Sequence, residues 1–292
     1  MSLYISANVF TVRYKIERES IEIRMSADET GKFGTAVVTG ASAGIGKMYA
    51  ERLAKKGYDL LLIARRADRL ALIAKELTQQ YGVSVKTQVA DLANPTELEA
   101  VSKSLAENEL ITLLVNNAGT SFVGPLDGAT VDQLHTLVNI NIVALTRLAM
   151  AVLPGFKSRN QGAIVNLGSA VGFDGYPYTP IYGATKAYVQ NLTRALQAEL
   201  AGTNVVVQLV TPAATVSELW EVSGFALSNI DPKLVMSTED LVDAALVGLE
   251  RKEKVTAPSV QDEAAVTKYL EAAAELLGAS QTGKPAPRYV NQ

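Results

Sequence analysis

The sequence predicts an α/β domain in which a parallel sheet of about seven strands lies between two layers of helices, a doubly wound α/β/α arrangement. From Thr35 onward, short apolar segments alternate with longer segments of helical periodicity, which is the pattern of repeated βαβ units. Most of the short segments are apolar along their whole length, as expected of strands that helices cover on both faces. The chain length of 292 residues suits one domain of this class.

The expected elements follow from these alternating segments. The expected strands cover residues 35–39, 59–64, 84–90, 110–116, 163–167 and 205–209. The expected helices cover residues 45–56, 67–80, 95–107, 131–153, 181–201, 238–250 and 262–277. Gly57 follows the first helix, at a position where a left-handed cap favours glycine. After Pro212 the pattern becomes looser.

Composition excludes several classes of function. Hydrophobic residues make up 48% and charged residues 20% of the chain, with a formal net charge of −3; this mild acidity gives no general attraction to nucleic acid or an anionic membrane. The chain has no cysteine and one histidine, His135, which excludes disulfides, zinc–thiolate sites and a histidine-rich metal cluster. Neither a membrane-spanning apolar segment nor a secretory signal is recognised. We expect a cytoplasmic protein with no metal, no nucleic-acid partner and no membrane association.

Residues 1–32 form an extension that differs from the rest of the chain. Val12, Tyr14 and Ile16 alternate with charged residues, which is a weak strand pattern. Two interpretations remain open, an untethered tail and an arm that reaches a partner subunit. The single dinucleotide-binding domain is expected over residues 33–292.

A glycine-rich turn joins the first expected strand to the first helix. It has the sequence Thr39-Gly40-Ala41-Ser42-Ala43-Gly44-Ile45-Gly46. Glycines let the backbone turn tightly and approach a pyrophosphate, and a helix N-terminus offers unpaired N–H groups. The alternative is a tight turn without a ligand, but its place at the first βα junction favours a Rossmann-type dinucleotide site. The turn lacks the Gly-Lys-Ser/Thr ending of a P-loop, which argues against ATP or GTP chemistry.

The end of the second expected strand indicates which dinucleotide binds. Arg65 and Arg66 follow this strand, and no carboxylate occurs before Asp68. An acidic residue here holds the ribose of NAD, whereas arginine accommodates the 2′-phosphate of NADP, which suits the planar guanidinium. We expect NADP, with Arg65 as the main contact, Arg66 beside it and Ser42 as a second donor. The alternative is two solvated arginines at a helix start.

Tyr182 and Lys186 are the candidate acid/base pair. Their separation of four places both side chains on one helix face. A phenol has a pKa of about 10, and a neighbouring ammonium can lower it by roughly 1–3 units, which favours proton exchange with an alkoxide. Ser169 lies thirteen residues before Tyr182, near the carboxyl end of an expected strand, where open α/β sheets bind their ligands.

Taken in order, these motifs resemble the short-chain dehydrogenase/reductase family over about residues 33–257. The glycine-rich turn, Asn116-Asn117-Ala118-Gly119, Ser169 and Tyr182-x-x-x-Lys186 carry the resemblance. The resemblance implies that Tyr182 is the general acid/base and that Ser169 donates a hydrogen bond to the substrate oxygen. Lys186 would hold the nicotinamide ribose and lower the pKa of the tyrosine.

The resemblance also assigns further residues. Asn141, rather than Asn139, would anchor a water that relays protons from the lysine, because the family places this asparagine at a fixed distance before Pro154. The implied cofactor contacts are Gly40, Ser42, Gly44, Ile45, Gly46, Arg65, Arg66, Asp91, Leu92, Asn117, Ala118, Gly119, Tyr182, Lys186, Pro212 and Thr215. The family usually has Pro-Gly where this chain has Pro212-Ala213.

Family members use the region of residues 213–237 as a substrate lid, and Trp220 and Phe225 are expected to form an apolar wall there. They also pair through their two long helices, which implies a homodimer or homotetramer. The sequence therefore predicts an NADP(H)-dependent oxidoreductase, similar to ketone and 3-ketoacyl or hydroxysteroid reductases, that reduces a ketone or aldehyde. A non-catalytic NADP sensor and a methyltransferase on a similar sheet are the rival interpretations, and neither needs a tyrosine–lysine pair.

Overall fold

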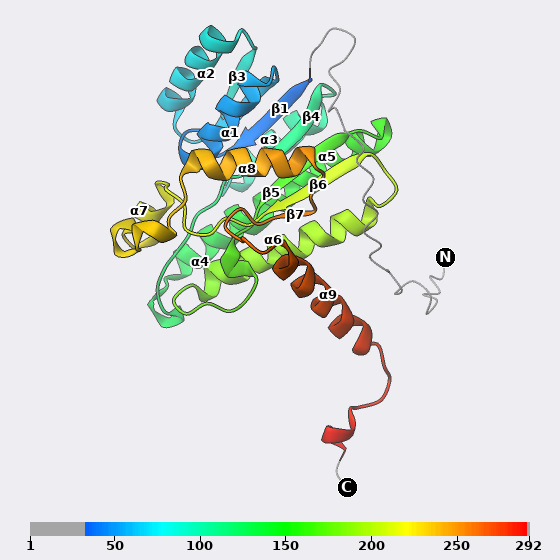
Figure 1. The fold of residues 1–292 in the computed structure, drawn as a ribbon. Helices are drawn as coiled ribbons and strands as arrows, with labels where there is room; N and C mark the ends of the chain where they lie inside the picture. The colour runs from blue at the N-terminus through cyan, green and yellow to red at the C-terminus, as the bar shows by residue number, and fades with distance from the viewer. Residues whose placement is uncertain (1–32, 291–292) are drawn as a thin grey trace. The chain divides into compact units, whose positions relative to one another are not determined.

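The computed structural model describes residues 33–290, so the expected extension of residues 1–32 lies outside the described residues. Residues 33–259 belong to one compact unit, and residues 260–290 belong to another. Within the first unit, seven strands form a parallel sheet in the order β3-β2-β1-β4-β5-β6-β7 (Figure 1). Because the order runs outward from β1 in both directions, the sheet is doubly wound. The predicted fold class is confirmed.

Most elements lie where the apolar segments predict them. The strands are β1 (Thr35–Thr39), β2 (Asp59–Ala64), β3 (Val85–Val89), β4 (Ile111–Asn116), β5 (Gly162–Leu167), β6 (Val205–Val210) and β7 (Val255–Thr256). The helices are α1 (Gly44–Lys55), α2 (Ala67–Tyr81), α3 (Pro95–Ala106), α4 (Val131–Val138), α5 (Leu145–Arg159), α6 (Pro180–Glu199), α7 (Leu219–Ser223), α8 (Thr238–Glu250) and α9 (Glu263–Ala279). Short 3₁₀ turns lie at η2 (Leu126–Gly128), η4 (Ala170–Gly172), η5 (Leu227–Asn229), η6 (Pro232–Leu234) and η7 (Pro287–Tyr289).

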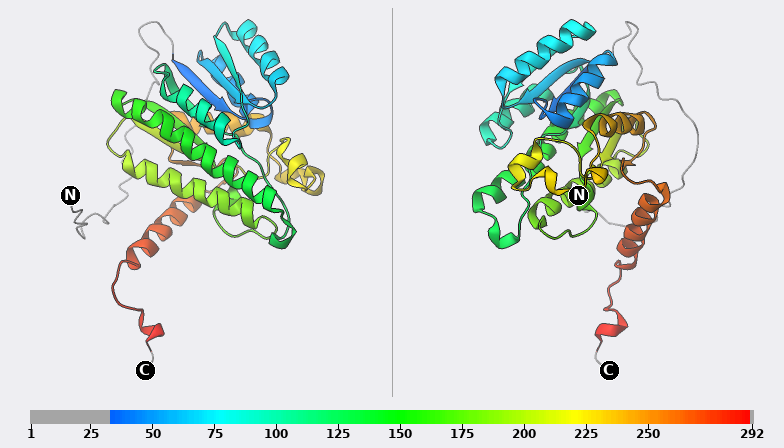
Figure 2. Two further views of the ribbon diagram at one scale, coloured as in Figure 1. Left: turned by 180° about the vertical axis from the view of Figure 1, so that it is seen from behind. Right: turned by 60° about the vertical axis from the view of Figure 1, so that its left-hand side comes forward.

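The two faces of the sheet carry different helices (Figure 2). In β1, Ala36 and Val38 pack in the core formed with α1, α2 and α8, whereas Val37 packs in the opposite core with α3 and α5. Side chains of a strand alternate between its faces, so a strand covered on both sides is apolar throughout. The edge strand β3 differs, because its residues are half-buried or exposed.

The predicted helix over residues 131–153 is a longer run of three segments. Between α4 and α5 lies a π-helical segment, η3 (Asn139–Ala144). The run passes Pro154 and ends at Arg159, and Asn160, which follows it, has a left-handed φ of 50°. Residues Val131–Arg159 are long and apolar enough to cross a membrane by length and composition, but α5 contributes buried residues such as Phe156 to the core. A core helix passes the same test.

The described part of the second unit contains helix α9 and no strand. The side chain of Asp262 accepts a hydrogen bond from the Ala264 N–H and caps the helix. Leu276 and Leu277 are exposed. The single domain predicted over residues 33–292 stays a prediction.

Candidate active site

The carboxyl ends of β1, β4, β5 and β6 carry most of the predicted site residues. Parallel strands place these ends along one edge of the sheet, where open α/β folds bind ligands. The glycine-rich turn follows β1, Asn117 follows β4, Ser169 follows β5 and Pro212 follows β6. The predicted residues are therefore brought to one edge, although they are far apart in sequence.

The glycine-rich turn has the backbone of an anion-binding site. Gly40 and Gly44 have φ values of 67° and 51°, which only glycine adopts readily. A Cβ at Gly46 would collide with the Gly40 carbonyl oxygen, so this position also requires glycine. Helix α1 begins after Ala43 without a hydrogen bond from a capping side chain. Its first N–H groups are thus available to a pyrophosphate.

Asn117 hydrogen-bonds with the glycine-rich turn and holds it in place. Its side-chain Nδ2 donates to the Thr39 carbonyl at 2.8 Å, and its backbone N–H donates to Thr39 Oγ1 at 3.0 Å. The N–H of Ala118 donates to the same hydroxyl at 2.9 Å. These bonds tie the end of β4 to the turn after β1, so Asn117 acts on the cofactor site through the position of the turn.

Three of the four predicted catalytic side chains meet at α6 and the carboxyl end of β5. Lys186 Nζ lies 5.7 Å from the centre of the Tyr182 ring and donates to the Leu167 carbonyl at 2.8 Å. The Ser169 side chain hydrogen-bonds with Tyr182 and reaches the Pro212 carbonyl at 3.4 Å. The carboxyl end of β5 thereby holds both the serine and the lysine beside the phenol.

Burial controls the protonation of this pair. It raises the pKa of Tyr182 to about 12, and the hydrogen bond with Ser169 acts in the opposite direction. Burial lowers the pKa of Lys186 to about 8. The expected lowering of the phenol pKa by the lysine is therefore not what the structure shows, because desolvation disfavours both charged forms. At neutral pH, Tyr182 is protonated and ready to donate.

Asn141 joins the loop after β4 to α6. Its Oδ1 accepts from the Thr120 N–H at 2.9 Å, and its Nδ2 donates to the Thr120 carbonyl at 2.9 Å and to Thr185 Oγ1 at 3.0 Å. Thr185 Oγ1 donates in turn to the Tyr182 carbonyl at 2.8 Å. Asn141 is buried in η3, so this segment connects directly to the helix that carries the phenol. The predicted water at Asn141 stays a prediction.

Gln190 is a positioning residue that the sequence analysis did not identify. Its Nε2 donates to the Ser169 carbonyl at 3.1 Å, and the side chain is buried. It lies four residues beyond Lys186 on α6, on the same helix face. The spacing of four residues from Lys186 could have indicated Gln190 from the sequence. It does not show which backbone group the side-chain amide contacts.

The two arginines after β2 are placed differently from each other. Arg66, rather than Arg65, lies at Ser42: its Nε and Nη2 are 3.1 and 3.0 Å from Ser42 Oγ. Arg66 Nη1 also donates to Glu218 Oε2 at 2.7 Å. The Arg65 side chain is 68% exposed, with Nη1 4.0 Å from Asp91 Oδ2. No sequence motif marks Glu218, because only the path of the lid brings it to Arg66.

The remaining predicted cofactor residues lie in the loops around the site. Asp91 accepts a backbone hydrogen bond at 3.0 Å from the residue two positions on, and Leu92 is buried. The Pro212 carbonyl accepts from the N–H that begins η4, and Thr215 Oγ1 donates within its own loop. A Cβ at Gly119 would lie 3.2 Å from Asn141 Oδ1, so glycine keeps this loop close to Asn141.

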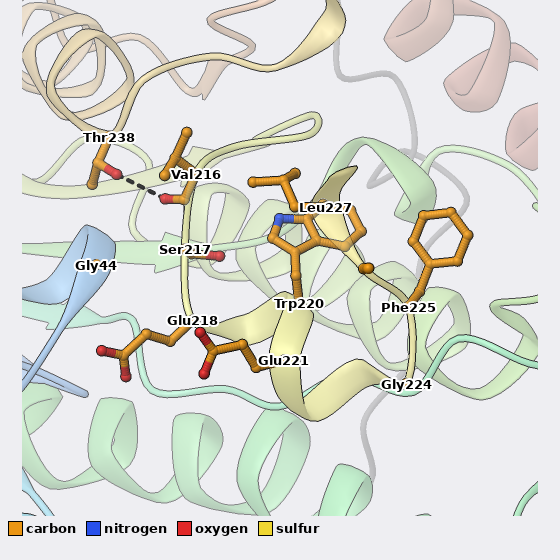
Figure 3. Close-up of a pocket in the computed structure, with 11 residues that line it drawn as sticks. Gly44, Val216, Ser217, Glu218, Trp220, Glu221, Gly224, Phe225, Leu227 and Thr238 are labelled. Carbon is orange, nitrogen blue, oxygen red and sulfur yellow. Dashed lines mark hydrogen bonds between the residues drawn. The ribbon is translucent and has the colours of Figure 1, made fainter. Parts of the chain in front are cut away.

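The lid lines an open cavity beside the glycine-rich turn. The cavity has a volume of about 640 Å³, and Figure 3 shows its lining with the Trp220 and Phe225 side chains. The rings of Trp220 and Phe225 are 6.3 Å apart, and Val216 and Leu227 add further apolar surface. Gly44 lines the same cavity, so the predicted apolar wall adjoins the phosphate-binding turn.

Together, the doubly wound sheet, the uncapped glycine turn and the Ser–Tyr–Lys group define an α/β protein with a dinucleotide-type site and an acid/base pair. A model of the short chain dehydrogenase family matches residues 34–224. The chain belongs to this family, as the motifs predicted.

Known relatives agree with this assignment. The chain is 38% identical over 192 residues to a very-long-chain 3-oxoacyl-CoA reductase of Anas platyrhynchos, a match that covers 64% of this chain and 62% of the relative. The match thus spans less than two thirds of that relative's length. A short-chain dehydrogenase from Sphingobium yanoikuyae in complex with NADPH has a TM-score of 0.83 and 43% identity, and covers 88% of this chain and 100% of its own. A bulky-bulky ketone specific alcohol dehydrogenase from Comamonas testosteroni has a TM-score of 0.81 and 37% identity, covering 88% and 99%.

Proposed function

We propose that this chain is an NADPH-dependent oxidoreductase that reduces a ketone or aldehyde to an alcohol. The observation that carries the proposal is the position of the Tyr182 phenol, hydrogen-bonded with Ser169 and one helical turn from Lys186, at the edge of the sheet that carries the glycine-rich turn. An acid/base group in this position serves a reaction in which a proton and a hydride are both transferred.

The residues present fit a 2′-phosphorylated dinucleotide. The left-handed glycines and the uncapped start of α1 suit the pyrophosphate, and Ser42 with Arg66 offers donors of the kind that bind phosphate. When bound, the nicotinamide supplies the hydride. Arg65 is exposed beside Asp91 and is a further candidate contact. The relative from Sphingobium yanoikuyae that binds NADPH supports this choice of cofactor.

The side chains of this site supply the proton. Tyr182 donates to the carbonyl oxygen while the hydride adds to the carbonyl carbon, so one proton and one hydride give the alcohol. Ser169 donates a hydrogen bond to the same oxygen and polarises the carbonyl. Lys186, whose pKa is lowered to about 8, can exchange protons near neutral pH and restore the phenol. Asn141 lies beside this route through Thr185.

An apolar substrate is the class that we propose. Val216, Trp220, Phe225 and Leu227 give the lid cavity its apolar surface, and Ser217, Glu218, Glu221 and Thr238 give it polar groups. Pockets that are mostly apolar, with a few polar groups, bind apolar ligands. Two relatives are named for carbonyl substrates, one as a very-long-chain 3-oxoacyl-CoA reductase and one as a bulky-bulky ketone specific alcohol dehydrogenase. A bulky ketone or a long 3-oxoacyl thioester is therefore the first substrate to test.

The test is NADPH oxidation, followed by absorbance, with a panel of bulky ketones, 3-oxoacyl thioesters, steroids and sugars. Tyr182→Phe should bind NADPH as the wild type does, yet lose about 10²- to 10⁴-fold in kcat, because it removes the proton donor. Tyr178→Phe, which alters an exposed tyrosine, is the matched control and should stay active. Full activity of Tyr182→Phe would refute the mechanism, and NADPH binding without turnover on any carbonyl would favour the sensor interpretation.

We also propose that the protein works as a homodimer or homotetramer in the cytoplasm. Support for the assembly comes from exposed apolar side chains on the long helices, such as Met150 of α5 and Tyr188 of α6. The cytoplasmic location and the lack of membrane association stay predictions from composition, to be tested by cell fractionation.

A further inference from the structure

The lid has a fixed base. Residues 213–237 leave the sheet edge and return beside their starting point, where the Val216 N–H donates to the Met236 carbonyl at 3.1 Å and the Met236 N–H donates to the Ala214 carbonyl at 2.9 Å. Thr238 Oγ1 adds a hydrogen bond to the Val216 carbonyl at 2.8 Å. These hydrogen bonds hold the two ends of the segment together, and the residues between them, including α7, form a single loop.

An ion-pair network connects this loop to Arg66 and Arg69, in the segment where the cofactor assignment above puts the 2′-phosphate. Glu218, which immediately precedes α7, accepts from Arg66 Nη1 at 2.7 Å and from Arg69 Nη1 at 2.6 Å. These two guanidiniums hold the pKa of Glu218 below its usual range. The Glu218 side chain is therefore an anion at neutral pH, with one carboxylate oxygen on each arginine.

Arg66 is shared between the lid and the glycine-rich turn. Its Nε and Nη2 face Ser42 Oγ, while its Nη1 faces Glu218. Carboxylate and phosphate oxygens use the same guanidinium donors. The contact that Glu218 makes with Arg66 is thus chemically equivalent to the contact that a 2′-phosphate would make there.

We propose that Glu218 is a latch that competes with the 2′-phosphate of the dinucleotide for Arg66, so that binding of NADP(H) releases this side of the lid. The proposal rests on the cofactor assignment made above and adds a regulatory role for the lid. A 2′-phosphate that takes Arg66 leaves Glu218 with Arg69 alone and weakens the tether of α7. NAD(H) has no group for Arg66, so it leaves the latch in place. A ligand shifts a conformational equilibrium only through such a difference in contacts.

The chain contains its own reporter of this latch. Trp220 is the single tryptophan of the sequence, and it lies two residues after Glu218 in α7. Its Nε1 donates to the Thr215 carbonyl at 2.8 Å, which fixes the indole to the base of the lid. Tryptophan fluorescence and its quenching by acrylamide therefore report directly on α7.

The experiment titrates NADP⁺ and NAD⁺, which differ only in the 2′-phosphate, against the wild type, Glu218→Gln and Glu221→Gln. Glu221 is the carboxylate within α7 itself, three residues after Glu218, and it makes no ion pair among the described residues. Glu218→Gln should bind NADP⁺ roughly threefold to fivefold more tightly, as loss of a half-exposed ion pair allows. Its NAD⁺ affinity should not change, and Glu221→Gln should match the wild type. In the wild type, NADP⁺ should increase acrylamide quenching of Trp220 and NAD⁺ should not; in Glu218→Gln quenching should be high from the start.

Unchanged or weaker NADP⁺ binding by Glu218→Gln would overturn the latch, as would equal tightening for both dinucleotides. Equal affinities for NADP⁺ and NAD⁺ in all three proteins would overturn the latch together with the NADP preference. These readouts need no turnover, so a protein that shows the predicted binding but reduces no carbonyl would refute the proposed reaction and leave the latch standing.

Discussion

At the scale of single residues, desolvation rather than pairing sets the charges of the acid/base group. Lys186 and Tyr182 lie one helical turn apart, and the lysine ammonium donates to the Leu167 carbonyl. Both pKa values move toward the neutral form. The spacing of the two residues was visible in the sequence, but their burial depends on how α6 packs on β5. The direction of the phenol's shift was therefore beyond sequence analysis.

The buried lysine predicts a pH-dependent stability. A lysine side chain ordinarily has a pKa of 10.5, and burial lowers the pKa of Lys186 to about 8 in the folded protein. Between these values the unfolded state binds more protons, so the free energy of unfolding rises with pH. Below pH 8 the cost of burying the ammonium is present in full, on the order of 3 kcal/mol. Lys186→Met removes this cost. As pH increases from 7 to 10, the Tm of the wild type, measured by thermal denaturation, should rise relative to the Tm of Lys186→Met. A difference in Tm that is independent of pH would contradict the lowered pKa.

The two arginines after β2 make a second prediction at this scale. The sequence favoured Arg65 for the 2′-phosphate, and the structure places Arg66 at Ser42. We expect Arg66→Ala to weaken NADPH binding by about 10-fold, because it removes a charge-assisted contact, and Arg65→Ala to weaken it less. Neither change should alter NADH binding much, since NADH lacks the phosphate. Equal losses for both cofactors, measured by titration, would argue against the NADP preference.

At the scale of secondary structure, sequence analysis predicted the bounds of an element correctly where the local pattern of apolar residues determines them. Residues 35–39, 59–64 and 238–250 were predicted to the residue, because a covered strand is continuously apolar and a helix is amphipathic. Strand β7 has two residues, too few to show any periodicity. The π-helical segment η3 was missed for another reason, since the side-chain pattern of the run continues through it and only the backbone changes.

The segment η3 predicts a contrast between two asparagines. Asn141 is buried and pairs both backbone groups of Thr120, whereas the side chain of Asn139 is half-buried. Asn141→Ala would leave the part-buried N–H and carbonyl of Thr120 without these partners, at a cost of up to about 1–3 kcal/mol each. We expect it to lower Tm by several degrees and to raise the KM for NADPH by loosening the loop around Gly119. Asn139→Ala is the control with little expected effect, and equal effects of the two changes would show that η3 does not position this loop.

At the scale of the whole molecule, the fold explains why separate motifs could be predicted as one site. A doubly wound sheet sends the turn after β1 and the loops after β4, β5 and β6 to the same edge, so the order of motifs along the chain was enough to place Asn117, Ser169 and Tyr182 together. The same rule does not place the lid. Its contact with Arg66 depends on a loop whose path no local pattern specifies, and Glu218 therefore appeared only in the structure.

Assembly is the remaining property at this scale, and α5 and α6 offer the surface for it. The two helices contact each other through Thr146 Oγ1 and the Tyr188 hydroxyl, 3.1 Å apart. On the outer side of α5, Met150 is 65% exposed. A monomer tolerates one large apolar side chain at this exposure. Covering that side chain with a second copy removes apolar surface from water and therefore stabilises the assembly. A charge at the same place would have to be desolvated on assembly.

We therefore expect Met150→Arg to weaken self-association at least 10-fold, about 1.4 kcal/mol, as measured by light scattering after size-exclusion chromatography over a range of concentrations. Leu72→Arg is the matched control, because Leu72 is 57% exposed on α2, which packs on the opposite face of the sheet. A loss of assembly in Met150→Arg alone would place the interface on α5. Equal dissociation of both variants, or an assembly that survives Met150→Arg, would locate the interface elsewhere. A monomeric wild type would show instead that this apolar face of α5 stays in contact with water.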